Sequence, residues 1–363
     1  MLTAKEIGFM NRVAVIGHFG GDKYFCDGQT VKTKNTAELL ERHGTFAVTS
    51  VDTYYFKTNK LKLLADTVCA LFTCEHIFLL VSVNGMRVYL PLLYYLNKIT
   101  KKNIYHYIIG SEILDLVACN KKLVQYLNAM AANWFEYESG TQCLRQMGVT
   151  NVSTLPNFKL LTPVPEATVY IPENGVYRFC TFSRVMEEKG ITDAINAVRR
   201  INSSYSHKIL HLDIYGPIDP AYSDTLQQLL KDCSDCISYM GVAQSSESVE
   251  ILKNYYALLF PTRWAGEGFP GTIIDAFASG LPVIASDWNA NKELIQDMKQ
   301  GILYPSSDFR TMEDALLWAV QNPDQMARMR SESRATYDQY TPDAVWCRIH
   351  AKMQEDSFLG SVS

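Results

Sequence analysis

The segment from Pro261 to Ala276 contains the residues whose types and spacing are best suited to chemistry. An apolar run that ends at Phe260 leads into a glycine-rich turn, and a helical pattern begins at Pro270. Proline fits the first turn of a helix, and glycines let backbone N–H groups approach an anion at the helix's positive end. We therefore expect an anion-binding corner between a strand and a helix.

Two carboxylates belong to this corner. Glu267 precedes the expected helix and Asp275 lies inside it, so we expect both side chains to reach one pocket. Ionised carboxylates accept hydrogen bonds and donate none, which suits the hydroxyl groups of sugars and ribose and suits phosphate poorly. An anion site beside two carboxylates is the combination that a nucleotide sugar requires.

The corner resembles the motif of the family-4 glycosyltransferases (glycosyl transferases group 1), in which a Glu, seven residues and a second acid follow one another. Glu267 and Asp275 have this spacing, although the second acid is usually Glu. Residues 276–286, Ala-Phe-Ala-Ser-Gly-Leu-Pro-Val-Ile-Ala-Ser, continue the resemblance, which covers most of the C-terminal half. It implies that Glu267 contacts the transferred sugar and Asp275 the ribose. The other donor-binding residues expected here are Gly268, Phe269, Pro270 and Gly271.

Residues 183–190 resemble the family's Gly-Arg-(four residues)-Lys-Gly motif, with Ser183 in place of the first glycine. The matching cations are Arg184 and Lys189. Glycosyl transfer expels a nucleotide diphosphate, whose growing charge must be neutralised by a metal or by fixed donors. Because the sequence contains no Asp-X-Asp metal motif, we expect metal-independent catalysis by Arg184, Lys189 and Glu267, without a cofactor. Solvated surface charge is the alternative interpretation of the two cations.

Two further loops match the family in part. Gly28, preceded by Asp27, stands where the family carries glycines near the donor phosphates, and a plain helix start capped by Asp27 is the alternative. Gly110, Ser111 and Glu112 resemble a family loop that follows a histidine contacting the sugar's 6-hydroxyl group. Glu112 is either a polar group of the pocket or the first-turn acid of a helix.

Ile109 occupies the position of that family histidine, which makes a 6-deoxy sugar or a pentose a hypothesis for the donor. The alternative is that a neighbouring residue or water supplies the hydrogen bond to the 6-hydroxyl group. His106, three residues earlier, lies in an expected strand. Because side chains alternate between the faces of a strand, we expect His106 to be a core residue and not a substitute for the family histidine.

Apolar runs, among them a strand expected near Trp134–Glu138, alternate with helical patterns along the chain, which predicts an α/β protein with doubly wound parallel sheets. The resemblance implies the GT-B fold, with two Rossmann-like domains facing a central cleft. We expect an acceptor-binding domain over 1–165, a nucleotide-sugar-binding domain over 166–340, and a C-terminal helix over 341–363 that crosses back to the first domain. Residues 159–175, with three prolines, are the expected linker.

Composition narrows the class of protein. The chain has 363 residues, 47% of them hydrophobic and 20% charged, and no apolar run reaches the roughly 18 residues of a membrane span. It has no signal-like N-terminus, and its nine cysteines lack a disulfide framework, Cys233 and Cys236 included. We therefore expect a cytoplasmic protein with reduced thiols and no metal site.

Charge is divided unevenly. Lys and Arg outnumber Asp and Glu by 17 to 12 in residues 1–165, whereas residues 166–363 hold 17 against 26. The basic N-terminal domain could face an anionic membrane as a peripheral protein, and the alternative is that solvated faces simply differ in charge.

These observations predict a retaining glycosyltransferase that moves a sugar from a nucleotide-diphosphate sugar to a glycan or lipid-linked acceptor in bacterial-type surface polysaccharide or glycoconjugate assembly. Retention is implied by the resemblance alone. We expect no nucleic-acid partner. The alternatives are a nucleotide-sugar epimerase of the same fold and a catalytically silent subunit that binds nucleotide sugar.

Overall fold

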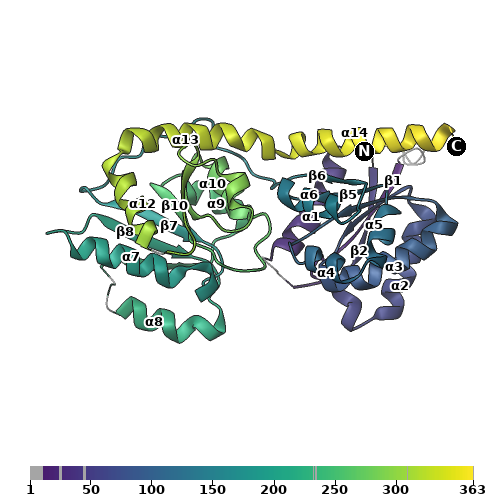
Figure 1. Cartoon of the computed structure of the whole chain (residues 1–363), viewed down its shortest axis with the longest axis horizontal. Coiled ribbons are helices and arrows are strands. Elements are labelled where there is room, and N and C mark those ends of the chain that lie inside the picture. Colours follow the sequence, from purple (N-terminus) through teal and green to yellow (C-terminus); the bar gives the residue numbers. More distant parts are fainter. Residues whose placement is uncertain are drawn as a thin grey trace. The chain divides into compact units, whose positions relative to one another are not determined.

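The structure is a computed structural model that describes residues 11–23, 27–43, 46–231, 233, 235–308 and 310–362, without the side chains of residues 11 and 357–362. The chain forms two compact units (Figure 1). One unit runs to Lys159 and includes the segment from Pro342 onward, and the other comprises Leu160–Thr341. Cys26 and the N-terminal segment 1–10 lie outside the described residues.

The first unit is built on a parallel sheet of six strands in the order β2-β1-β3-β4-β5-β6. The strands are β1 (Asn11–Gly17), β2 (Phe46–Asp52), β3 (His76–Leu80), β4 (Asn103–Tyr107), β5 (Ala132–Phe135) and β6 (Val152–Thr154). The helices are α1 (Gly28–Arg42), η2 (Thr53–Lys57), α2 (Lys60–Thr73), α3 (Val83–Thr100), α4 (Ile113–Cys119), α5 (Lys122–Asn128), α6 (Glu138–Gln146) and α14 (Pro342–Val362).

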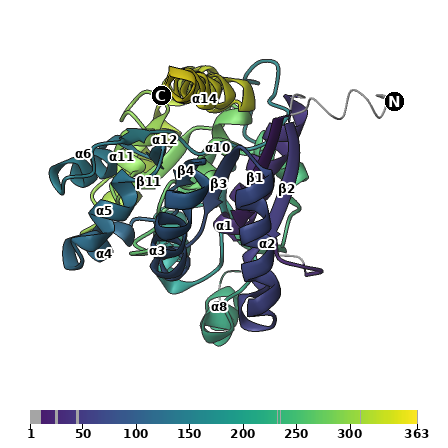
Figure 2. The same cartoon turned by 90° about the vertical axis from the view of Figure 1, so that its right-hand side faces the viewer.

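Helices cover both faces of this sheet. Val13 to Ile16 of β1 are fully buried, as expected for a central parallel strand. Right-handed crossovers place α2 and α3 on one face, where they pack against each other (Figure 2). On β4, Tyr105 and Tyr107 share the other face, where Lys32 of α1 lies 3.7 Å from the Tyr107 ring centroid and Asp356 of α14 hydrogen-bonds Tyr105.

The second unit contains another parallel sheet of six strands, in the order β12-β11-β10-β7-β8-β9. The strands are β7 (Tyr177–Phe182), β8 (Leu210–Tyr215), β9 (Ile237–Gly241), β10 (Ala257–Phe260), β11 (Val283–Ser286) and β12 (Gly301–Tyr304). The helices are η3 (Glu187–Lys189), α7 (Ile191–Ser203), η4 (Pro220–Tyr222), α8 (Ser223–Lys231), η5 (Ser245–Glu247), α9 (Ser248–Leu252), α10 (Gly271–Ala278), α11 (Asn291–Leu294), α12 (Arg310–Gln321), α13 (Pro323–Tyr337) and η6 (Asp338–Tyr340).

The two six-stranded parallel sheets confirm the predicted fold class. The boundary between the units differs from the expected one, because residues 160–168 hydrogen-bond into the second unit. The Val164 N–H donates to the Ala278 carbonyl at 2.9 Å, and Arg330 Nε donates to the Thr168 carbonyl at 2.7 Å. The expected linker is therefore mostly part of the second unit.

Three strand assignments also differ from the sequence-based expectation. We expected a strand near Trp134–Glu138, but β5 ends at Phe135 and Glu138 begins α6. Strands β6 and β12 were not anticipated, because three or four residues are too short for a recognisable pattern. Among the described helices, none is long and apolar enough to cross a membrane.

Candidate functional site

Two loops meet at the carboxyl ends of neighbouring strands in the second unit. Residues 183–190 follow β7 and residues 261–270 follow β10, which pairs with β7 in the sheet. Gly190 has a φ of +72°, and a Cβ added to it would lie 2.2 Å from the Pro261 carbonyl oxygen. Only glycine fits such a contact, so this residue lets the two loops approach each other.

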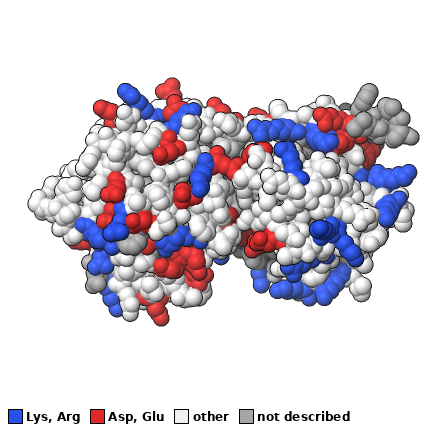
Figure 3. Space-filling view, viewed as in Figure 1, with Lys and Arg blue, Asp and Glu red and all other residues white. Residues whose placement is uncertain are grey.

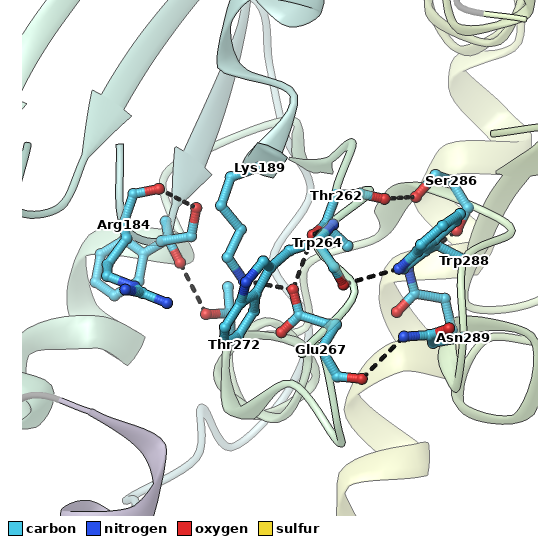
Figure 4. Close-up of polar contacts among 12 residues, drawn as sticks. Arg184, Lys189, Thr262, Trp264, Glu267, Thr272, Ser286, Trp288 and Asn289 are labelled. Atoms are coloured by element: carbon cyan, nitrogen blue, oxygen red, sulfur yellow. Dashed lines mark hydrogen bonds and ion pairs between the residues drawn. The ribbon is translucent and has the colours of Figure 1, made fainter. Parts of the chain in front are cut away.

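Lys189 and Glu267 form a buried ion pair between these loops (Figure 4). The Thr262 hydroxyl donates to the same Glu267 oxygen, Oε2, at 2.8 Å. Burial lowers the pKa of Lys189, while its attraction to Glu267 opposes that change. Because both donors use Oε2, the other carboxylate oxygen, Oε1, is the one that a ligand hydroxyl would use.

Trp264 brings a second cation to the site. The Arg184 guanidinium carbon and the Lys189 Nζ each lie 4.8 Å from the centroid of the Trp264 ring. The negative face of an indole attracts cations, which favours placing these two like charges near one another. Arg184 is exposed whereas Lys189 is buried. The structure thus brings together all three residues that we expected to be catalytic.

Ser286 at the end of β11 and residues of the loop after it hold the loop 261–270 in place. Ser286 Oγ donates to the Thr262 carbonyl at 2.6 Å, Trp288 Nε1 to the Trp264 carbonyl at 2.9 Å, and Asn289 Nδ2 to the Glu267 carbonyl at 3.0 Å (Figure 4). The sequence analysis missed these residues. Their position after the next strand of a parallel sheet was the signal that could have found them, since carboxyl ends of such strands meet at one edge.

Helix α10 presents its N-terminus at the same edge. We expected the helix to start at Pro270, but Pro270 is the residue before it and the first helical residue is Gly271. Thr272 Oγ1 donates to the Phe182 carbonyl at 2.7 Å, which ties the start of α10 to the end of β7. The first N–H groups of a helix have no partner within it, and this end carries partial positive charge.

The four residues expected to bind a donor at this turn divide into two kinds. Gly268 and Gly271 are partly exposed, so a ligand can reach their backbone. Phe269 and Pro270 are buried, and the Phe269 ring packs edge-on against Tyr340 with centroids 5.6 Å apart. The Phe269 side chain therefore anchors the turn in the core, and the backbone is what remains for binding.

Asp275 is buried and has a hydrogen-bond partner on a neighbouring helix. It lies inside α10 with an exposed fraction of 1%, and Ser248 Oγ of α9 donates to its Oδ1 at 2.9 Å. An aspartate is one methylene shorter than the glutamate usual in the family, so its carboxylate stays closer to the helix. That both carboxylates reach one pocket stays a prediction.

The remaining site candidates belong to the first unit. Gly28 begins α1, with Asp27 as its cap: the Thr30 N–H donates to Asp27 Oδ1 at 3.0 Å. Gly110 has a φ of +81°, a conformation that favours glycine, and Ser111 is half-buried. Glu112 is exposed and lies directly before α4, where its side chain makes no capping hydrogen bond. It therefore lies at the start of a helix, the position that one of its two expected roles requires.

His106 is a core residue, as predicted. It is fully buried on β4, and its Nδ1 lies 3.1 Å from Asn133 Oδ1. Burial lowers the pKa of His106 to about 4, so the ring is neutral at pH 7. Ile109 is half-buried in the loop after β4.

The second-unit site can bind an extended anion beside a polyhydroxylated group. Two cations and a helix N-terminus suit phosphate, and the carboxylate of Glu267 beside Lys189 can accept hydrogen bonds from hydroxyl groups. Within the described residues, no group of three or more His, Cys, Asp or Glu side chains is placed to hold a metal ion.

Solved structures share this architecture. The crystal structure of Anabaena HepE in complex with UDP matches 95% of this chain and 100% of its own, with a TM-score of 0.71 and 13% identity. The sucrose-phosphate synthase of Thermosynechococcus elongatus matches with a TM-score of 0.70 and 15% identity. The fold is therefore GT-B, with two Rossmann-like domains. Residues 177–322 match the family described as Glycosyl transferases group 1.

Curated relatives match over part of their length. The amylovoran biosynthesis glycosyltransferase AmsK of Erwinia amylovora is 28% identical over 148 residues, which are 39% of this chain and 35% of the relative. A GDP-mannose-dependent alpha-(1-6)-phosphatidylinositol monomannoside mannosyltransferase of Mycobacterium tuberculosis is 26% identical over 180 residues, 48% of this chain and 45% of its own. The matched segments thus span less than half of these relatives.

Proposed function

We propose that this protein is a glycosyltransferase that moves a sugar from a nucleotide-diphosphate sugar to a glycan or lipid-linked acceptor. Its process would be the assembly of a bacterial-type surface polysaccharide or glycoconjugate at the cytoplasmic side of a membrane. The match of residues 177–322 to the family Glycosyl transferases group 1 supports the reaction class. The name of the Erwinia relative supports the process.

The observation that carries the proposal is the adjacency of Lys189 and Glu267, with Arg184 beside the same Trp264 ring that Lys189 contacts. In a nucleotide-diphosphate sugar, the phosphate is bonded directly to the sugar's anomeric carbon. A cation that holds this phosphate must therefore lie beside the group that holds the sugar hydroxyls. The buried ion pair supplies that arrangement.

The charge of each group at the site gives its role in the proposed reaction. Arg184, Lys189 and the N–H groups at the start of α10 stabilise the negative charge that grows on the leaving diphosphate. Glu267, which pairs with Lys189 and accepts a hydrogen bond from Thr262, accepts hydrogen bonds from sugar hydroxyls through Oε1. These fixed donors allow charge neutralisation without a metal ion.

The reaction would retain the configuration of the anomeric carbon. The bond from this carbon to the phosphate oxygen breaks while the acceptor oxygen bonds on the same face, and the leaving phosphate takes the acceptor's proton. No enzymic nucleophile is required. Product stereochemistry, determined by NMR, tests this part separately, and an inverted product would contradict it.

A thermal-shift experiment tests the donor site. Ligands that bind only the folded protein raise its Tm by mass action. UDP or GDP should raise the Tm of the wild-type protein, and the shift should be much smaller for Arg184→Ala. Inorganic sulfate at equal ionic strength is the control. Equal shifts for both proteins would show that the nucleotide does not bind at this site.

A further inference from the structure

Three neighbouring elements of the first unit expose large apolar side chains next to lysines. These elements are η2, α2 and α3, and their exposed apolar residues are Tyr55, Phe56, Leu61, Leu64, Phe72, Val88, Tyr95 and Ile99. We call this region the α2–α3 surface. Monomeric proteins rarely leave an extensive apolar patch uncovered, so such a surface marks an interaction.

Helix α2 carries two apolar stripes. Leu63, Thr67, Ala70 and Leu71 are buried against the domain. Leu61, Leu64, Val68 and Phe72 recur at intervals of three and four residues and form a second stripe that faces outward, with Leu61 82% exposed and Phe72 64% exposed. Residues at this spacing share one side of a helix, and packing within the domain does not account for the second stripe.

Helix α3 repeats the pattern. Met86, Tyr89, Leu90 and Leu93 are buried. Val88, Leu92, Tyr95 and Ile99 form an outward stripe, and Ile99 is 75% exposed. Because α2 and α3 cover the same face of the sheet and bury their inner stripes on it, their outer stripes face the same direction (Figure 2).

The surface is also basic. Residues 53–102 contain seven Lys and Arg against two acidic residues, an excess of five that equals the whole excess of residues 1–165. Figure 3 shows Lys and Arg gathered where η2 and α2 lie. Several ammonium groups lie beside surface aromatic rings: Lys60 Nζ is 5.3 Å from the Phe56 ring centroid, and Lys98 Nζ is 4.6 Å from that of Tyr94.

We propose that the α2–α3 surface docks the protein on an anionic lipid bilayer. Outward leucine, isoleucine and phenylalanine side chains enter the boundary between headgroups and acyl chains, tyrosines lie at the headgroup level, and lysines contact anionic headgroups. A second protein copy offers the same basic charge and would repel this surface. An anionic bilayer complements both its charge and its apolar stripes. The inference is independent of the proposed enzymatic function, since it concerns binding alone.

Vesicle co-sedimentation of the full chain tests the proposal. The wild-type protein should bind phosphatidylcholine vesicles that contain phosphatidylglycerol, and binding should weaken with salt because surface attraction is screened within about 10 Å at 0.1 M ionic strength. Phosphatidylcholine alone should bind much more weakly. Equal binding to both vesicles, or none to either, would overturn the proposal.

Two variants separate the apolar and the charged contributions. Leu61→Ser with Phe72→Ser should lower the partition coefficient by about tenfold for each side chain removed from the bilayer. Lys57→Gln, Lys60→Gln and Lys62→Gln should each lower it by about fivefold, with a weaker salt dependence. All five positions are exposed, so the fold should be preserved, and an unchanged Tm checks this.

The matched control removes equally exposed apolar side chains from the second unit. Val169 and Ile171 are 78% and 80% exposed, and Val169→Ser with Ile171→Ser should leave vesicle binding unchanged. Loss of vesicle binding in this control would contradict the assignment of binding to the α2–α3 surface. Analytical ultracentrifugation of the wild type should show a monomer, and a dimer abolished by Leu61→Ser with Phe72→Ser would assign the surface to self-association and overturn the proposal.

Discussion

The Lys189 side chain contacts both the Glu267 carboxylate and the Trp264 ring, so a change in one of these residues alters the surroundings of the others. Glu267 compensates the burial of the Lys189 ammonium group, and Trp264 provides an aromatic face to both Lys189 and Arg184. Removing one partner of a buried ion pair leaves an uncompensated charge and is strongly destabilising. Tests of chemistry at this site therefore start with Arg184, which is exposed and free of that complication.

We expect Arg184→Ala to lower kcat/KM by about 2 to 4 kcal/mol, because Arg184 stabilises charge that grows in the transition state. Steady-state kinetics with a nucleotide-sugar donor measure this loss. Arg310→Ala, which removes another exposed arginine of the same unit, should have little effect. Wild-type activity in Arg184→Ala would show that this cation does not hold the diphosphate.

Lys189→Ala should lose a similar amount of transition-state stabilisation and also unfold at a lower temperature, since Glu267 is left buried without its cation. Adding Glu267→Gln should restore much of the Tm and none of the turnover. A double variant that regains activity together with stability would assign Lys189 a purely structural role.

Glu267 and Asp275 should separate binding from turnover. Glu267→Gln should chiefly lower kcat, because its carboxylate accepts hydrogen bonds from the sugar being transferred. Asp275→Asn should chiefly weaken UDP or GDP binding, if the ribose displaces Ser248 from that carboxylate. Isothermal titration and kinetics distinguish them, with Ser248→Ala as the control for lost packing. Equal effects on nucleotide affinity would remove this division of roles.

The sequence motif predicted the three charged residues that meet at the site, because loops after neighbouring parallel strands converge. It could not predict the burial of Asp275, which depends on Ser248, a residue 27 positions away. The contacts of Trp264 could not be predicted from the sequence for the same reason. Its partners lie in another loop, and only the pairing of β7 with β10 brings them into contact.

At the level of elements, long apolar strands were predictable and short ones were not. The error at β5 has a physical cause, since Trp134 to Glu138 alternates in the manner of a strand. Glu136 is buried there because Lys32 pairs with it at 2.5 Å, a contact between residues 104 positions apart. A local sequence pattern does not show that a carboxylate will be buried against a cation from a distant part of the chain.

The contact between the two site loops gives a stability prediction. Gly190→Ala should lower the Tm, with a cost of more than about 1 kcal/mol from left-handed backbone alone and more from the Pro261 contact. Gly28→Ala is the matched control, because φ is ordinary there and no atom lies within 4 Å of the added Cβ. Thermal unfolding of both variants measures the difference. Equal Tm values would contradict the close approach of the loops.

Strand β4 gives a prediction for pH. The pKa of His106 is about 4 in the folded protein, below the value of 6.5 for an unperturbed histidine. The unfolded chain therefore binds more protons between these values, so stability is full above about pH 6.5 and falls as pH drops towards 4, by about 3 kcal/mol in total. Urea unfolding across this range should show that slope, and His106→Leu should reduce it. An unchanged slope in His106→Leu, with His207→Gln as control, would contradict the assignment.

On the scale of the whole chain, the net charge of −4 is the sum of a basic first unit and an acidic second unit. The first unit holds the basic excess on η2, α2 and α3, and the second holds the acidic excess together with the candidate donor site. The two-domain architecture was predictable from alternating strands and helices. The outward apolar stripes of α2 and α3 were not, because periodicity identifies an apolar stripe without telling whether anything covers it.

Release of nucleoside diphosphate from a panel of nucleotide sugars is the most direct test of the central claim. We expect slow release from one donor by hydrolysis, faster release with a glycan or lipid-linked acceptor, persistence in EDTA, and loss in Arg184→Ala. An epimerised nucleotide sugar as the product would instead identify an epimerase. Binding of nucleotide sugar with no release from any donor would identify a silent subunit and contradict the account.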